Sequence, residues 1–118
     1  MKFLMTDIMR GDIWLTDLDP TSGHEINKTR PCVIIQNDTG NKQSSLTIIA
    51  PITSRNIENL YPIEVFLSER TMGLEKDSKI LLDQIRAIDK KRLIKKLGKV
   101  SNEVIPKINE ALKISLGL

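Results

Sequence analysis

The segment GHEINKTRPCVII, residues 23–35, contains the only histidine and the only cysteine of the chain. Its first half is crowded with charged and titratable groups, whereas its second half is an unbroken apolar, β-branched run. Such a run predicts a buried strand, which we place at residues 32–37. Because Pro31 disfavours a helical backbone at Arg30, we expect this arginine to be extended and to lie directly before the strand.

Short apolar runs on both sides of this segment predict further strands, each bounded by turn residues. These strands are expected at residues 12–18, 46–54, 63–67 and 79–88. Pro51 indicates an edge strand or a bulge, since proline cannot donate a hydrogen bond to a neighbouring strand. The run at 79–88 is long enough to be a helix instead, and residues 38–41 predict a turn.

The C-terminal segment, residues 102–117, has the spacing of an amphipathic helix. Its apolar face would carry Ile105, Ile108, Leu112 and Leu116. Ser101 is a candidate N-cap and Gly117 a candidate terminator, whereas Pro106 requires the helix to begin close to it. Five or six short strands and one helix predict a mainly β, α+β domain, a small curled sheet or barrel on which the helix packs.

Composition is typical of a single globular domain without covalent cross-links. The 118 residues are 40% hydrophobic and 28% charged, and the net charge of +3 permits an anionic partner. One cysteine excludes an internal disulfide, and a single histidine leaves few ligands for a metal ion, so we expect no cofactor. Because neither a signal peptide nor a membrane-spanning run is recognisable, a cytoplasmic protein is expected.

The loop before the second strand, residues 19–31, is long for a compact domain and is therefore a candidate functional loop. Arg30 offers a guanidinium fork to a phosphate. Histidine is the residue type whose unperturbed charge changes nearest neutral pH, which makes His24 a candidate for proton transfer, and Glu25 can act as a base or orient another group. Together they suit cleavage of RNA by its own 2′-hydroxyl, which needs proton transfer and a cation but no metal ion. The alternative is a solvated loop of mixed charge without a chemical role.

Several motifs, in order along the chain, resemble one known family. They are RGDIWLTDLDPTSGHEINKTRP, VIIQND, IIAPITS, LLDQIRAIDKKRL and INEALKISLGL. With these motifs the chain resembles, from Arg10 to its C-terminus, the MazF/PemK (Kid) toxin endoribonucleases of type II toxin–antitoxin systems. Residues 10–118 would then form a single toxin domain. Residues 1–9 would be either an N-terminal extension or a misassigned start, with Met9 as the initiator.

The resemblance implies an SH3-like barrel with appended helices, a fold that the family shares with the gyrase poison CcdB. It also implies a homodimer that cuts single-stranded RNA, mRNA included, at short sequences without a metal ion. The products would carry 2′,3′-cyclic phosphate and 5′-hydroxyl ends. An antitoxin partner is implied as well, a MazE-like protein whose acidic, disordered C-terminal segment folds onto the toxin.

The resemblance further implies roles for five residues. Arg30 matches a general acid or base that also stabilises the phosphate, and Thr53 matches a threonine that positions it. Glu25 matches a loop glutamate whose loss inactivates the toxin, and His24 matches an assisting histidine of the PemK/Kid branch. Asp83 matches an aspartate with a catalytic part in that branch.

Asp83 has two interpretations. The PemK/Kid branch has an arginine two residues earlier, where this chain has Leu81, so the chemistry would rest on Arg30 and Thr53. Within an apolar run, Asp83 is either a buried structural carboxylate or a functional one. Arg86, in the same run, is expected to form a structural ion pair.

Contacts to RNA are expected from loop residues, because aromatic side chains that could stack on bases make up only 3% of the chain. The candidates are Lys28, Thr29, Ser54, Arg55 and Gln84. The basic run at 90–99 is either a solvated face or a source of nonspecific attraction to phosphates. Trp14 would close the core or flank the groove, and Cys32 would be a core residue.

Two other functions compete with RNA cleavage. One is a non-enzymatic toxin of the CcdB type that traps a topoisomerase. Against it, the C-terminal ISLGL lacks the tryptophan with which CcdB engages gyrase. The other is an inactive barrel that only binds an antitoxin or RNA, which the intact set of Arg30, Thr53 and Glu25 disfavours.

Overall fold

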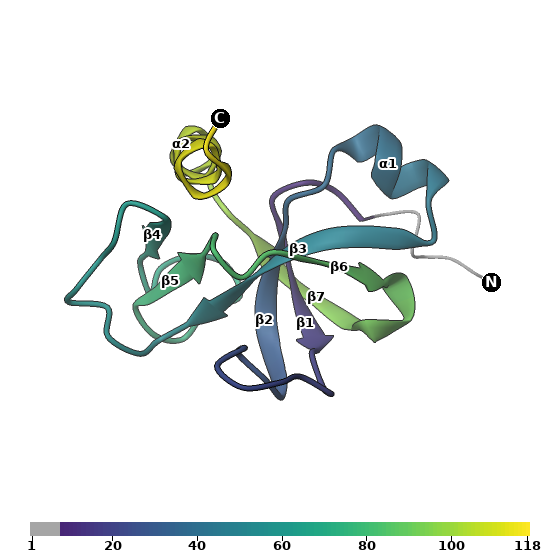
Figure 1. The fold of residues 1–118 in the computed structure, drawn as a ribbon, viewed down its shortest axis with the longest axis horizontal. Coiled ribbons are helices and arrows are strands. Elements are labelled where there is room, and N and C mark those ends of the chain that lie inside the picture. The colour runs from purple at the N-terminus through teal and green to yellow at the C-terminus, as the bar shows by residue number, and fades with distance from the viewer. Residues whose placement is uncertain (1–7) are drawn as a thin grey trace.

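Seven antiparallel strands and two α-helices make up residues 8–118, the part of the chain that the computed structural model describes (Figure 1). The elements are β1 (Asp12–Asp17), β2 (Thr29–Ile34), α1 (Asp38–Gln43), β3 (Leu46–Thr53), β4 (Glu64–Leu67), β5 (Ser78–Leu81), β6 (Arg86–Asp89), the 3-10 helix η2 (Lys90–Arg92), β7 (Leu93–Lys99) and α2 (Ile105–Leu116). The strand order is β4-β5-β3-β2-β1-β7, and β6 pairs with β3. The prediction of a mainly β fold with a C-terminal helix is confirmed. The sheet curls like a barrel, although within residues 8–118 its end strands β4 and β7 do not pair.

β3 is the central strand and has three neighbours. On one side it pairs with β2, so that Cys32 is opposite Pro51 and Ile34 is opposite Ile49. On the other side its first half pairs with β6 and its last two residues pair with β5 (Figure 1). The edge strand predicted from Pro51 is therefore wrong. The proline lies between the β6 and β5 ladders, where neither strand supplies a partner for it.

The predicted single strand at 79–88 is two strands separated by a turn. β5 ends at Leu81 and β6 begins at Arg86, so residues 82–85 connect strands that pair with different parts of β3. The helix considered for this run is absent as well. Sequence alternation did not reveal the break, because Leu82 and Ile85 pack on the core although they lie outside both strands.

Three elements have no counterpart among the predicted ones, namely α1, η2 and β7. Residues 38–43 form α1 in place of a turn, and Asn37 caps this helix by accepting a hydrogen bond from Gly40 N at 2.8 Å. The basic run contains β7, which pairs along β1. Gly98 permits the close approach of another segment to β7, since a Cβ there would lie 2.0 Å from the carbonyl oxygen of Met72.

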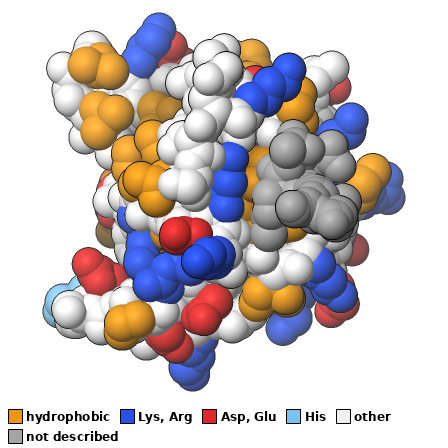
Figure 2. All heavy atoms as spheres, turned by 90° about the vertical axis from the view of Figure 1, so that its right-hand side faces the viewer, with side chains coloured by type: hydrophobic (Ala, Val, Ile, Leu, Met, Phe, Trp, Pro, Cys, Tyr) orange, Lys and Arg blue, Asp and Glu red, His pale blue; other side chains and the backbone are white. Residues whose placement is uncertain are grey.

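The positive charges of η2 and β7 face solvent or are bound to neighbouring groups. Lys96 forms an ion pair with the buried Asp12 at 3.3 Å, and Arg92 donates to main-chain carbonyls of Asp17 and Asp19. On the face drawn in Figure 2, basic and acidic side chains are interspersed. This run is therefore an edge of the sheet with local anchoring contacts. Among residues 8–118, no helix is long and apolar enough to cross a bilayer.

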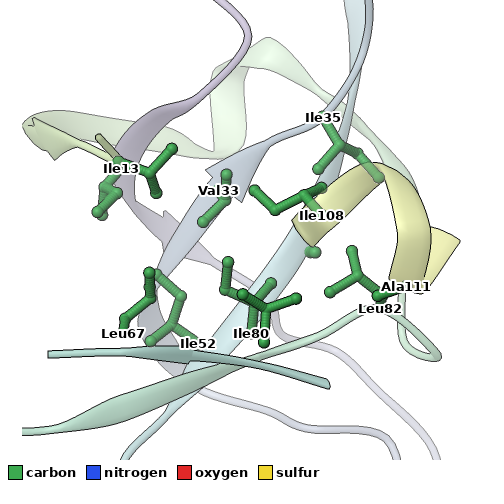
Figure 3. Close-up of a cluster of buried hydrophobic side chains, with 12 residues drawn as sticks. Ile13, Val33, Ile35, Ile52, Leu67, Ile80, Leu82, Ile108 and Ala111 are labelled. Carbon is green, nitrogen blue, oxygen red and sulfur yellow. The ribbon is translucent and has the colours of Figure 1, made fainter. Parts of the chain in front are cut away.

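Two hydrophobic clusters use the two faces of the curled sheet. Along β2, Val33 belongs to the first cluster, whereas Cys32 and Ile34 belong to the second. α2 covers the first cluster, into which Ile108 and Ala111 point (Figure 3). Fully burying one aliphatic side chain of this kind contributes roughly 1.5–3 kcal/mol to the stability of the folded state.

Helix α2 begins at Ile105, three residues later than the helix predicted at residues 102–117. Its N-cap is Val104, without a side-chain hydrogen bond, so the predicted Ser101 cap is wrong, and Pro106 lies in the first turn. Gly117 ends the helix with a left-handed backbone at φ 72°, which confirms the predicted terminator. Leu116 of the predicted apolar face is exposed.

The second cluster contains Ile8, Trp14 and Cys32, which confirms the core position of the tryptophan and the cysteine. Ile8 is fully buried, and the next residue, Met9, donates its main-chain N–H to Asp12 at 2.9 Å. Residues 1–9 are predicted to be an extension or a misassigned start, and residues 1–7 of this segment lie outside the described part of the chain.

Replacing Ile8→Ala should lower the free energy of unfolding by about 2–4 kcal/mol, because it leaves a cavity in the second cluster. The matched control Ile94→Ala, at a side chain that is 54% exposed, should cost about 1 kcal/mol or less. Urea unfolding followed by the fluorescence of Trp14 measures both. Equal losses in the two variants would contradict the packing of Ile8.

Candidate functional site

Arg30 is part of the sheet, further into β2 than its sequence suggests. The strand begins at Thr29, and Arg30 is opposite Thr16 of β1. Its Nε donates to the carbonyl oxygen of Asn27 at 2.7 Å, and its two terminal nitrogens make no hydrogen bond within residues 8–118. The half-buried guanidinium is thus held at one end and offers two parallel donors to an anion at the other.

Thr53 is the neighbour of Arg30 across the sheet. Paired positions of β2 and β3 end at Cys32 and Pro51, and Arg30 and Thr53 follow two residues beyond them on the same face. The two residues line the same two surface hollows. Thr53 is 7% exposed, and its Oγ1 accepts a hydrogen bond from Arg55 N at 3.2 Å. Since its hydroxyl proton has no acceptor within the described residues, Thr53 can shape the turn and still donate to a phosphate oxygen.

The β1–β2 loop, residues 18–28, is fastened to the turn between β5 and β6. Gln84 Oε1 accepts a hydrogen bond from Ile26 N at 2.7 Å, and Arg86 donates to the carbonyl oxygen of Leu18 at 3.0 Å. Arg86 therefore binds a main-chain carbonyl, and the ion pair predicted for it is wrong, since no ion pair among residues 8–118 includes it. Both contacts hold the loop over the same face as Arg30.

His24 and Glu25 lie on the exposed part of this loop. Glu25 Oε1 accepts a hydrogen bond from Ser22 N at 2.7 Å, and the second carboxylate oxygen has no partner within residues 8–118. An imidazole and a carboxylate in this position can exchange protons with a bound molecule.

Three adjoining hollows connect these residues. The central hollow, about 360 Å³, is lined by six of the predicted site residues: His24, Glu25, Arg30, Thr53, Arg55 and Gln84. The loop-side hollow, about 430 Å³, shares His24, Glu25 and Gln84 with it and extends to Pro51 and the β5–β6 turn. The strand-side hollow, about 330 Å³, shares Arg30 and Thr53 with the central one. The hollows thus form one surface with Arg30 and Thr53 at its middle.

The remaining predicted residues lie at its margins or outside it. Asp83 is exposed in the β5–β6 turn and lines the loop-side hollow, so the buried structural interpretation is wrong. Ser54 lines the strand-side hollow. Lys28 and Thr29 are exposed and line none of the three hollows. Lys28 instead has a left-handed backbone, φ 70°, that helps the chain re-enter the sheet.

Sequence reasoning missed Lys79, which also lines the central hollow. This lysine is opposite Thr53 in the β3–β5 register and is buried. A lone charge in an otherwise apolar strand was the available signal, because a buried lysine requires partners. Within residues 8–118, the histidine, cysteine and acidic side chains form no group of three that could hold a metal ion.

A match to one protein family covers this whole arrangement. The family model of the PemK-like, MazF-like toxins of type II toxin–antitoxin systems matches residues 9–116. The chain belongs to this family. The match includes every strand and all of α2, and it agrees with the resemblance that the motifs carry from Arg10 onward.

Solved structures of a MazF protein and of mycobacterial endoribonucleases share the fold of this chain. MazF from Deinococcus radiodurans superposes with a TM-score of 0.81 at 26% identity, over 94% of this chain and 97% of that one. An endoribonuclease from a mycobacterial species gives 0.77 at 23% identity, over 94% and 92%. Such an endoribonuclease in complex with its cognate antitoxin gives 0.78 at 23% identity, over 94% and 96%.

Cys32, on the same face beneath Arg30, should be unreactive in the folded toxin. Burial raises the pKa of its thiol from 9.0 to about 12, so the thiolate that attacks alkylating reagents is scarce at pH 8. We expect alkylation by iodoacetamide to be about 1000-fold slower in the native protein than after unfolding in guanidinium chloride. Mass spectrometry of timed samples measures both rates, and similar rates would contradict the burial of Cys32.

Proposed function

We propose that this toxin is an endoribonuclease that cuts single-stranded RNA, mRNA included, at short sequences and without a metal ion. The 2′-hydroxyl attacks the adjoining phosphorus, and the 5′-oxygen leaves. The products carry a 2′,3′-cyclic phosphate and a 5′-hydroxyl. The observation that carries the proposal is the Arg30 guanidinium, whose two terminal nitrogens have no partner within residues 8–118, in one hollow with Thr53, His24 and Glu25.

Each of these groups has a part in the proposed reaction. Arg30 and Thr53 donate hydrogen bonds to the non-bridging oxygens, whose negative charge grows in the transition state. Glu25, whose second carboxylate oxygen has no partner within residues 8–118, accepts the proton of the 2′-hydroxyl. His24, when protonated, returns a proton to the leaving 5′-oxygen. Asp83 lies in the adjoining hollow and takes no proton in this scheme.

RNA should lie along the three hollows, with its scissile phosphate at Arg30 and Thr53. Arg55 and Gln84 line the central hollow and are proposed to contact the flanking nucleotides, as is Ser54 in the strand-side hollow. Lys28 and Thr29 line none of the three hollows. Of these two residues, only Lys28 is proposed to contribute, through electrostatic attraction of the RNA.

Partners are part of the same proposal. D. radiodurans MazE–MazF and the mycobacterial complex hold a toxin together with its antitoxin. We expect this toxin to act in the cytoplasm as a homodimer and to be inhibited by a MazE-like antitoxin. An apolar groove between β4 and α2, lined by Leu60, Phe66 and Ala111, offers a surface on which one of these two protein partners could pack.

The purified protein should cut a mixed-sequence single-stranded RNA in EDTA and leave 2′,3′-cyclic phosphate ends. Arg30→Ala should lower kcat/KM by about 100-fold or more, because it removes two donors to the transition-state charge. Thr53→Val, of similar shape, should also lower it. The control Arg70→Ala removes an exposed arginine that lines none of the three hollows and should be fully active.

Well-folded wild-type protein that does not cut RNA, or equal cleavage by Arg30→Ala, would overturn this proposal. The CcdB-type alternative would then be tested by trapping of DNA gyrase on plasmid DNA. End-group analysis of the RNA fragments decides the chemistry independently of the rate.

The pH dependence of kcat should report His24, since it is the only histidine of the chain. A general acid must be protonated to donate its proton, so the activity of the wild type should fall at pH values where this acid has lost it. In His24→Gln this fall should vanish and the remaining rate should be lower. In Glu25→Gln the fall in activity at high pH should persist. If the fall is lost in Glu25→Gln, or is retained in His24→Gln, the general acid is not His24.

A further inference from the structure

Lys79 is a charged residue inside the site that the reaction scheme does not use. It is opposite Thr53 in the register of β3 and β5, and Arg30, on the neighbouring strand β2, lines the same central hollow as these two residues. Lys79 is only 5% exposed, unlike a lysine that collects phosphates from solution.

The ammonium of Lys79 is saturated by three acceptors. Nζ lies 3.1 Å from the carbonyl oxygen of Asn56, 3.4 Å from that of Asn59 and 2.9 Å from Glu64 Oε1. The same carboxylate oxygen accepts a hydrogen bond from Tyr61 N at 3.1 Å. One buried ion pair therefore binds the β3–β4 loop at three points between its two ends.

This loop begins at the catalytic centre. The hydroxyl of Thr53 holds Arg55 N, Asn56 follows with a left-handed backbone at φ 53°, and both Arg55 and Asn56 line the central hollow. Left-handed backbone at a non-glycine residue persists where the surroundings hold it in place. Here the Lys79 ammonium, on the Asn56 carbonyl, supplies such a restraint.

A buried ion pair is a poor device for stability, since well-packed apolar residues of similar size do as well or better. The three contacts also leave no proton of Lys79 for a phosphate. What the pair provides is the position of the loop backbone beside the scissile phosphate.

We propose that Lys79 and Glu64 are positioning residues that set the RNA sequence preference of the toxin, through Arg55 and Asn56. An amide side chain on a fixed backbone can read base edges, and a fixed guanidinium can stack on a base or bind the next phosphate. This inference rests on the proposed ribonuclease function and adds to it the residues that determine where the RNA is cut.

The test removes both charges together, in Lys79→Met with Glu64→Met. Lys79→Met alone leaves a buried carboxylate unpaired and should destabilise the fold, whereas the double variant leaves none and should recover the melting temperature. The Asn56 and Asn59 carbonyls nevertheless lose their donor, and the Tyr61 N–H loses its acceptor. The double variant therefore separates loop position from global stability.

Two readouts follow for the double variant, compared with wild type in EDTA. Sequencing of the fragment ends from a random RNA pool should show cuts at a broader set of sequences. KM for the preferred RNA should rise about tenfold with kcat nearly unchanged, because the contacts outside the reacting atoms are the ones that loosen. The matched control Lys113→Met, in the exposed ion pair with Glu110, should change neither readout.

Combining the double variant with Arg55→Ala tests whether Lys79 and Glu64 act on the sequence preference through Arg55. Arg55→Ala should broaden the cut sites of the wild type but have little further effect in the double variant, because the two changes act on one contact. Independent, additive effects would assign Lys79 and Glu64 to a different role.

The inference is overturned if the folded double variant cuts with wild-type KM and an unchanged set of sequences. If wild-type protein cuts no RNA, the ribonuclease proposal fails first, and hydrogen exchange then decides the positioning. Amides of residues 55–61 should exchange faster in the double variant than in wild type. Equal protection would show that the pair does not hold the loop.

Discussion

The change of partner along β3 is the constraint on which the remaining structure depends. On one side, β3 pairs with β2. On the other side, the residues before Ala50 pair with β6 and those after Pro51 pair with β5. A proline has no N–H to give to a ladder, so the sheet can divide there without losing a hydrogen bond from that residue. The β5–β6 turn enters the gap, and the loop-side hollow, which Pro51 lines, forms beside it.

The same arrangement distributes the positive charges of the site. Arg30, Lys79 and Arg86 come from three different strands to one face, and they differ in what their nitrogens bind. Lys79 Nζ has three acceptors and Arg86 donates through one terminal nitrogen to the Leu18 carbonyl, whereas both terminal nitrogens of Arg30 have no acceptor among the described residues. Lys79 and Arg86 bind main-chain carbonyls and hold the two loops that frame the hollow. Proximity of a charge to the site therefore does not by itself define its role, since the contacts that each cation already makes with the protein differ.

Much of the fold was predictable because local patterns and tertiary packing agree there. The strands near residues 12–18, 46–54 and 63–67 and the Gly117 terminator were found within a residue of their observed ends. The break at 82–85 was not predictable, because Leu82 and Ile85 continue the apolar pattern through a turn. β7 was missed since an edge strand with exposed lysines has too little alternation to be distinguished from a solvated loop.

For the site, the sequence by itself determined which chemical groups are present and which loop carries them: His24 and Glu25 in a long connection, and Arg30 at the start of an apolar strand. It could not determine which protons are free, because that depends on carbonyls distant in sequence, such as those of Asn56 and Leu18. Tertiary structure alone placed Asp83 in solvent at the rim and Lys79 under the β3–β4 loop. The physical reason is that strand register, a property of the whole sheet, decides which side chains meet.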